Sequence, residues 1–251
     1  MRIVVLLLGV LAGLAVLAIG IALVRFNLKR RRVIRSAAAL TDDELESIYS
    51  QIERGAEDTG STGWVLARTN RTVAGSRSLI RLPDGCADFP WAGRVVMLEA
   101  GEEVTFRFVE ESVTETSIAG RVFRPVLVPR QRLRSGKLRN VFWPQRLLAT
   151  NDALAAMLGK VSPDLPQELL SYLLCAGRES FEFEPIDQAR IGTTPSWIQG
   201  PEWPACTVCG RRMTLILQIP GTLFSPAPMG TYYWFGCGKD LDSTHAINQF
   251  T

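Results

Sequence analysis

The sequence predicts an α+β protein: an N-terminal transmembrane helix, followed by a β-rich mixed body with a C-terminal element organised by cysteines. Three observations carry this prediction. Residues 3–24 contain no charged residue, and nearly all of them are apolar. After residue 63 the apolar residues alternate, as in strands. Three of the five cysteines and the single histidine fall within residues 206–245.

The uncharged stretch at residues 3–24 is long enough to cross a bilayer as one helix. A cleaved signal peptide would carry its basic residues before the apolar stretch, but here only Arg2 precedes it. Six basic residues follow it: Arg25, Lys29, Arg30, Arg31, Arg32 and Arg35. Because basic residues mark the cytoplasmic side, we expect a single-pass protein of the inner or cytoplasmic membrane. Residues 3–24 would contact lipid, with the N-terminus outside and the body in the cytoplasm.

The charge of the chain is unevenly distributed. The formal net charge is +3, but residues 1–35 hold seven basic residues and no acidic ones. The remaining residues hold 21 basic and 25 acidic side chains, a net charge of −4. An acidic body argues against a dedicated nucleic-acid-binding protein. We therefore divide the chain into an anchor with a basic flank at residues 1–35 and a folded body.

The first part of the body, residues 36–150, is predicted to contain one helix and several strands. Thr41 and Glu44 form a capping box, which predicts a helix over residues 42–54. Runs rich in Val, Ile and Phe then predict strands. They lie at residues 64–68, 77–82, 94–100, 103–111 and 121–128.

The second part, residues 151–251, begins with two predicted helices. Asn151 can cap the first; Pro166 lies in the first turn of the second, and Gly177 ends it. Strands are expected at residues 180–186, after Arg212, and in the aromatic run before Cys237. The sequence leaves open whether the two parts are separate domains.

The cysteines of the second part have the spacing of metal ligands. Cys206 and Cys209 form a Cys-x-x-Cys pair, and Cys237 and His245 follow the next strand. Three thiols and one imidazole match a closed tetrahedral zinc site, here in a zinc-ribbon-like element. A redox pair would more naturally precede a helix, whereas a strand follows this one. Three reduced core cysteines and a surface histidine are the other alternative.

The odd number of cysteines does not suggest a disulfide framework in a chain of this size. Cys86 and Cys175 have no histidine available to activate them, so we interpret them as buried thiols and not as nucleophiles. Reduced cysteines agree with a body in a reducing compartment.

The C-terminal region also resembles a known family. Gly192, Pro195 and Trp197-Ile198-Gln199 precede the stretch from Cys206 to Met213 and the run from Leu215 to Gln218. This pattern is similar to the YwqG-like family of uncharacterised bacterial proteins, and its cysteine portion to the programmed-cell-death-2-like family. The resemblance covers roughly residues 180–251. It implies a mixed or β-rich domain with no established catalytic activity.

Two functions are compatible with these observations. The first is a protein-binding or adaptor module with a structural zinc ion, whose partner contacts would be Trp197, Gln199 and Trp203, because tryptophan is frequent at interface hot spots. Both indoles could instead form the core around the metal. The second function is a zinc-dependent hydrolase with an open metal position. We favour the non-enzymatic module, because no acid–base motif is recognisable and no small-molecule substrate is implied.

Overall fold

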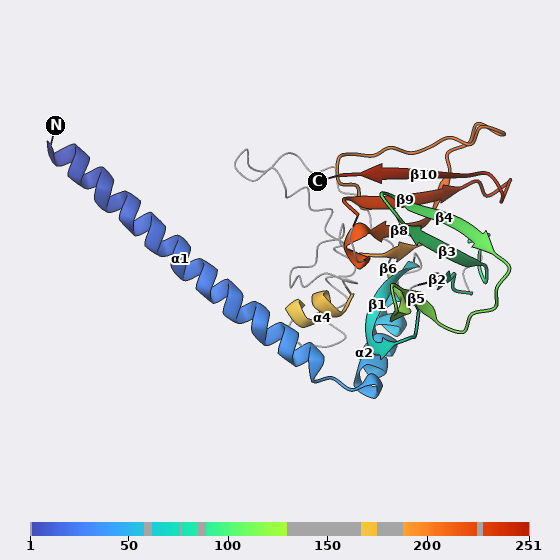
Figure 1. Cartoon of the computed structure of the whole chain (residues 1–251), viewed down its shortest axis with the longest axis horizontal. Helices are drawn as coiled ribbons and strands as arrows, with labels where there is room; N and C mark the ends of the chain where they lie inside the picture. Colours follow the sequence, from blue (N-terminus) through green and yellow to red (C-terminus); the bar gives the residue numbers. More distant parts are fainter. Residues whose placement is uncertain are drawn as a thin grey trace.

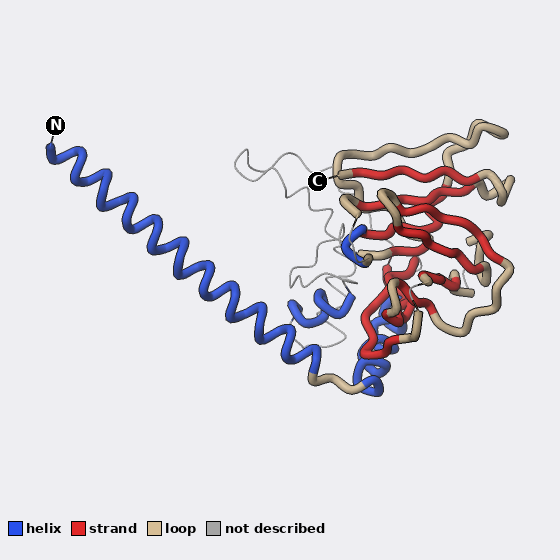
Figure 2. Tube along the Cα trace, in the orientation of Figure 1, coloured by secondary structure: helices blue, strands red, loops and turns tan. Residues whose placement is uncertain are grey.

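The computed structural model describes residues 2–57, 62–75, 77–84, 89–129, 167–174, 188–224 and 228–250. Ten strands form one sheet, in which every pairing is antiparallel. In order across the sheet they are β10, β9, β8, β7, β1, β6, β5, β2, β3 and β4. Few helices accompany it (Figures 1 and 2).

The strands come from both halves of the body. Those of the first half are β1 (Thr62–Thr72), β2 (Ser78–Arg81), β3 (Val95–Ala100), β4 (Val104–Val109), β5 (Thr116–Ile118) and β6 (Arg121–Pro129). Those of the second are β7 (Arg190–Ile191), β8 (Thr214–Pro220), β9 (Thr231–Gly236) and β10 (Thr244–Gln249). A short 3-10 helix, Gly221–Leu223, follows β8. The pairing of β7 with β1 joins the two halves into one sheet.

The predicted α+β fold class is therefore wrong: the described body is mostly a sheet. Its helices are α2 (Asp42–Glu57) and α4 (Gln167–Leu174), which lie beside the sheet. The sequence under-predicts strands because β5 has three residues and β7 only two, too few to show alternation. The helix predicted after Asn151 and the strand predicted at residues 180–186 lie outside the described residues.

The predicted membrane span is also contradicted. No helix in the described part of the chain is long and apolar enough to cross a membrane. Helix α1 runs from Arg2 to Ala38 and includes both the predicted span and the basic residues that follow it. The single-pass localisation predicted from residues 3–24 is overturned with it.

The sheet curls around one core. Trp234 of β9 stacks on Phe106 of β4, with ring centroids 5.6 Å apart, and lies 4.6 Å from the ring of Phe108. Strand β9, which is next to one end of the strand order, thus meets β4, at the other end, across the inner face. The buried side chains between them include Trp64, Leu66, Ile80, Trp91, Val96, Ile118, Ile216 and Leu217.

Helices cover one half of the outer face. Helices α2 and α4 pack on β1 and β6, which alternate their side chains between the two faces, and the C-terminal end of α1 packs against α4. The predicted capping box is confirmed: the Thr41 N–H donates to Glu44 over 2.7 Å, and the Glu44 N–H donates to the Thr41 hydroxyl over 3.3 Å. Hydrogen bonds from the backbone N–H and from the hydroxyl of Thr41 to the Glu44 carboxylate lower the pKa of Glu44. The buried face of α2 comprises Leu45, Ile48, Tyr49, Ile52 and Ala56.

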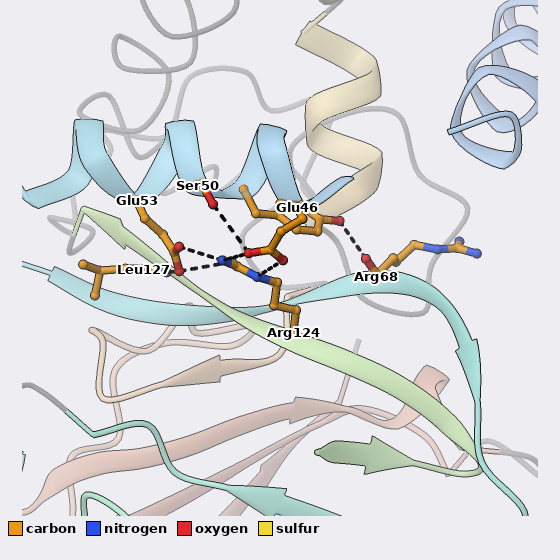
Figure 3. A network of polar contacts seen from close by, with 7 residues as sticks. Glu46, Ser50, Glu53, Arg68, Arg124 and Leu127 are labelled. Atoms are coloured by element: carbon orange, nitrogen blue, oxygen red, sulfur yellow. Dashed lines mark hydrogen bonds and ion pairs between the residues drawn. The ribbon is translucent and has the colours of Figure 1, made fainter. Parts of the chain in front are cut away.

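An ion-pair network fastens α2 to β6 (Figure 3). The Arg124 guanidinium donates to both carboxylate oxygens of Glu53, over 3.1 and 2.8 Å, and to Glu46 over 3.0 Å. Glu53 also accepts the backbone N–H of Leu127 over 3.2 Å. The side chains of Arg124 and Glu53 are 22% and 25% exposed, so solvent screens this pair less than a surface pair. Glu53 therefore accepts hydrogen bonds both from the Arg124 guanidinium and from a backbone N–H of β6.

Replacing Glu53 by Gln is expected to lower the free energy of unfolding by about 2 kcal/mol, because hydrogen bonds between charged groups are worth roughly 1.5–3 kcal/mol. Denaturant unfolding of the purified chain measures the change. Glu57→Gln is the matched control, since Glu57 is an exposed residue at the end of the same helix. Equal stability of the two variants would contradict the role of Glu53.

Candidate metal centre

The first two cysteines lie on a tight turn before β8. Ala205 and Arg212 form an antiparallel bridge that closes this turn. Inside it, the Cys206 N–H donates to the carbonyl of Arg211 and the Gly210 N–H donates to the carbonyl of Cys206, each over 2.8 Å. Gly210 has φ of +68°, a left-handed conformation that favours glycine. The turn thereby brings the side chains of Cys206 and Cys209 to one side.

The third cysteine follows β9 directly. The Cys237 N–H donates to the carbonyl of Ser243 over 3.0 Å, and the Ser243 N–H donates to the carbonyl of Asp240 over 3.0 Å. These bonds form the turn that connects β9 to β10. Cys237 is buried, and its position is fixed by the sheet.

The fold brings the three thiols together, and we call Cys206, Cys209 and Cys237 the three-cysteine cluster. Their sulfur atoms all lie within 4.8 Å of one another, and those of Cys209 and Cys237 are 3.5 Å apart. A tetrahedral zinc ion with Zn–S bonds of about 2.3 Å places its sulfurs about 3.8 Å apart. The cluster therefore has the donors and the approximate spacing for a metal ion.

Contacts within and around the three-cysteine cluster shift the pKa of two of its thiols. The Ser243 hydroxyl lies 3.4 Å from the Cys206 sulfur, and this contact, together with the backbone N–H of Cys209, lowers the pKa of the Cys206 thiol to about 6. The Arg211 N–H lowers the pKa of Cys209, but the contact with Cys237, burial and the contact with Cys206 outweigh it, and the net shift is upward. Cys206 is thus the thiol best prepared to bind a cation as thiolate.

We expect Ser243→Ala to raise the pKa of Cys206 in the metal-free protein, because the thiolate loses its strongest hydrogen bond. The pH dependence of alkylation at Cys206, followed by peptide mass spectrometry, measures this shift. In the wild-type chain the reaction should reach half its maximum near pH 6. Asp242→Ala, which changes the preceding exposed residue, is the control. An unchanged profile in Ser243→Ala would refute the assignment.

The predicted fourth ligand is not part of the cluster. His245 is exposed on β10, where it pairs with Phe235, and its ring lies outside the group of mutually close donor atoms. Directly paired residues of antiparallel strands share a face, so His245 lies on the same side of the sheet as Phe235 and Cys237. Asp240, which follows Cys237 at the spacing that Cys209 has from Cys206, is also outside the group.

An aromatic cluster covers the outer face beside the cysteines. Trp197 packs on Tyr233 and Phe235 of β9, with ring centroids 4.9 and 5.7 Å apart. Trp203 meets Trp197 edge-on at 5.6 Å and carries the Arg212 guanidinium 3.4 Å above its ring. Residues of this cluster and two of the cysteines form one buried group. The three-cysteine cluster and the aromatic cluster therefore share one buried group on this half of the outer face.

The three predicted partner-binding residues have different environments. Trp197 is 7% exposed and belongs to the core of the outer face. Trp203 is half-buried, while Gln199 is exposed and donates to the carbonyl of Phe250 over 3.0 Å. Only Gln199 and Trp203 can therefore contact another molecule without rearrangement.

Sequence reasoning missed a residue that holds the segment between β7 and β8 in place. Gln249 is fully buried; its side-chain oxygen accepts the N–H groups of Ile198 and Gln199 over 2.9 and 3.2 Å. Its amide donates to the carbonyl of Gly200 over 2.8 Å. The segment between β7 and β8 thus runs beside β10 (Figure 1). A glutamine near the chain end carries no spacing signal that predicts this role.

A cavity of about 510 Å³ lies elsewhere, between α2 and the ends of β1 and β6. Arginine–carboxylate pairs line it, among them Arg81 with Asp84 and Arg124 with Glu46. No member of the three-cysteine cluster lines this cavity.

Comparison of the chain with models of protein families, with curated proteins and with solved structures found no match. The resemblance to the YwqG-like and programmed-cell-death-2-like families remains a prediction.

Proposed function

We propose that the chain is a protein-binding module in which a structural zinc ion fastens the segment between β7 and β8 to the sheet. The observation that carries the proposal is the three-cysteine cluster, whose sulfurs lie within 4.8 Å of one another. Two of its thiols belong to the turn before β8 and the third follows β9, so a bound ion would connect the segment to the sheet. A structural ion stabilises a fold in this way because its binding free energy adds to the free energy of folding.

His245 is the fourth ligand in this proposal. It lies on the face of β10 that also carries the aromatic cluster, and together with the three thiols it would make a Cys₃His donor set. Such a set is typical of closed structural zinc sites. The donor set requires His245 to be neutral and the cysteines to be thiolates, so the affinity for zinc should fall as the pH falls.

The proposed partner surface is the exposed side of the zinc-held segment. Val208, at the tip of the cysteine turn, is 71% exposed. Trp203 and Arg212 stack on each other nearby, and both residue types are frequent at interface hot spots. Gln199 is exposed at the start of the same segment. Trp197, which is buried, is assigned to the core and not to the partner surface.

The proposal is tested by the metal content and its coordination. The reduced chain should contain one zinc ion per molecule, and a cobalt-substituted sample should show the absorption of tetrahedral cobalt bound by thiolates. His245→Ala should alter this spectrum and weaken binding, whereas Asn248→Ala, on the same strand, should alter neither. Folded, reduced protein that contains no metal after growth in zinc would refute the proposal.

The partner surface is tested separately. Val208→Asp places a charge at the tip of the turn without removing a ligand, so folding and zinc content should persist. Crosslinking in cells should then lose the partners captured by the wild-type chain. Thr207→Asp, at the neighbouring exposed position, controls for the added charge. Capture unchanged by Val208→Asp would contradict this surface.

A second candidate, a zinc-dependent hydrolase, is favoured by one observation: three cysteines gather while His245 stays outside, which would leave a position for water. Two arguments weigh against it. Catalytic zinc sites use mostly histidine and carboxylate ligands, because three thiolates reduce the electrophilicity of the ion. In addition, the group of close donors contains no carboxylate or imidazole to act as base. Zinc-dependent hydrolysis of model esters would favour this candidate.

A further inference from the structure

The three-cysteine cluster contains a pair of thiols arranged for oxidation. The sulfurs of Cys209 and Cys237 are 3.5 Å apart. A disulfide has an S–S bond of about 2.05 Å, so the two atoms need to approach by about 1.5 Å. Cys209 lies at an exposed turn and precedes Gly210, and this turn can make the movement more readily than β9.

The two thiols also differ in accessibility in the way that such a reaction requires. Cys209 is exposed, whereas Cys206 and Cys237 are buried. A soluble oxidant therefore reaches Cys209 first, because it is the one exposed thiol of the three-cysteine cluster and exposure promotes the oxidation of cysteines. The sulfur of Cys237, 3.5 Å from that of Cys209, is placed to resolve the oxidised thiol. The sulfur of Cys206 is in contact with the Ser243 hydroxyl.

We propose that Cys209 and Cys237 are a site of reversible oxidation, at which a peroxide forms a disulfide between the turn before β8 and the end of β9. The sulfur of Cys209 attacks the peroxide, giving a sulfenic acid and one water molecule. The sulfur of Cys237 then attacks that sulfenic acid and expels a second water molecule. The two sulfurs lose two electrons and the peroxide gains them, so two thiols and one hydrogen peroxide give one disulfide and two waters.

The disulfide and a bound metal ion exclude each other, because both use the sulfurs of Cys209 and Cys237. This part of the inference rests on the proposed zinc site. The disulfide joins the same two segments that the ion would join, so the segment between β7 and β8 stays attached to the sheet after oxidation. Oxidation would thus release zinc from a chain that remains folded.

The experiment uses the full chain with Cys86→Ser and Cys175→Ser, so that only the cluster can react. Metal-free protein is treated with hydrogen peroxide and digested with trypsin. Cys206 and Cys209 fall in one peptide, ending at Arg211, and Cys237 in another, ending at Lys239. A crosslink between these peptides is expected, and it should persist after Cys206→Ser. Reduction by dithiothreitol should reverse it.

Two outcomes would overturn the inference: a disulfide within the first peptide, between Cys206 and Cys209, or a crosslink that is lost in Cys206→Ser. In Cys237→Ser the resolving thiol is absent, and Cys209 should instead be trapped as a sulfenic acid by dimedone. No dimedone adduct at Cys209 would also count against it.

A parallel sample loaded with zinc separates this inference from the proposed function. Hydrogen peroxide should release zinc at the rate at which the crosslink forms, while circular dichroism stays unchanged. If the chain binds no zinc but forms the crosslink, the proposed function fails and the oxidation site stands. If zinc binds and no crosslink forms under any condition, the oxidation site fails and the proposed function stands.

Discussion

Replacing Cys209 by Ser is expected to abolish stoichiometric zinc binding and to remove the stability that the ion supplies. A ligand that binds only the folded state stabilises it in proportion to the logarithm of its free concentration over its dissociation constant. With free zinc at about 1,000 times that constant, the loss amounts to about 4 kcal/mol. Serine keeps the size of the side chain but not the thiolate, so the change isolates the metal–sulfur bond.

The measurement is the free energy of unfolding of the wild-type chain and the variant, with buffered free zinc and again with a chelator. The difference between the two proteins should appear with zinc and largely vanish with chelator. Thr207→Ala changes the same exposed turn without removing a ligand, and it should behave as the wild type. A Cys209→Ser variant that keeps one zinc ion per chain would show that Cys209 is not a ligand.

The three-cysteine cluster could be predicted from the sequence because most of its geometry is local. Two residues between Cys206 and Cys209, followed by Gly210, define a turn that aims both sulfurs in one direction. Cys237 follows an aromatic strand, which a short-range pattern predicts. The meeting of the third sulfur with the first two depends only on the pairing of the neighbouring strands β8 and β9.

The rest of the fold depends on contacts that no local pattern carries. Strand β7 has two residues, and it is a strand only because it pairs with β1 on one side and β8 on the other. The contact of Trp234 with Phe106 brings together residues more than one hundred positions apart. The burial of Trp197, which the sequence allowed equally as a partner contact, follows from the outward-facing rings of Tyr233 and Phe235. The alternating side-chain pattern of β9 can be seen in the sequence. The sequence does not show which face of this strand another segment covers.

The N-terminal prediction fails for a different reason. It rests on composition alone, since residues 3–24 lack charge. In the structure α1 continues to Ala38, and its last turns pack Val33 and Ala37 against the body. The basic residues that were interpreted as a topology signal belong to this same continuous helix.

Gly236→Ala is expected to destabilise the sheet by about 3 kcal/mol, at the upper end of the usual cost of overpacking. Gly236 is the last residue of β9, and its α-carbon faces the inner core. A Cβ atom there would lie 2.4 Å from the ring of Trp91 and 2.7 Å from the terminal methyl of Ile216. Both side chains are fully buried, so neither can move away without disturbing its own neighbours.

The substitution also separates the stability of the sheet from that of the metal site, because Gly236 immediately precedes Cys237. Unfolding is therefore measured with chelator present, so that zinc contributes to neither protein. Gly238→Ala is the matched control: it lies just beyond Cys237, and the nearest atom to its added Cβ, in Pro90, is 3.8 Å away, an ordinary contact. If Gly236→Ala is as stable as Gly238→Ala in chelator, Trp91 does not pack against β9 as described. If it is destabilised in chelator and also binds zinc more weakly, the position of Cys237 is set by the inner core before any ion binds.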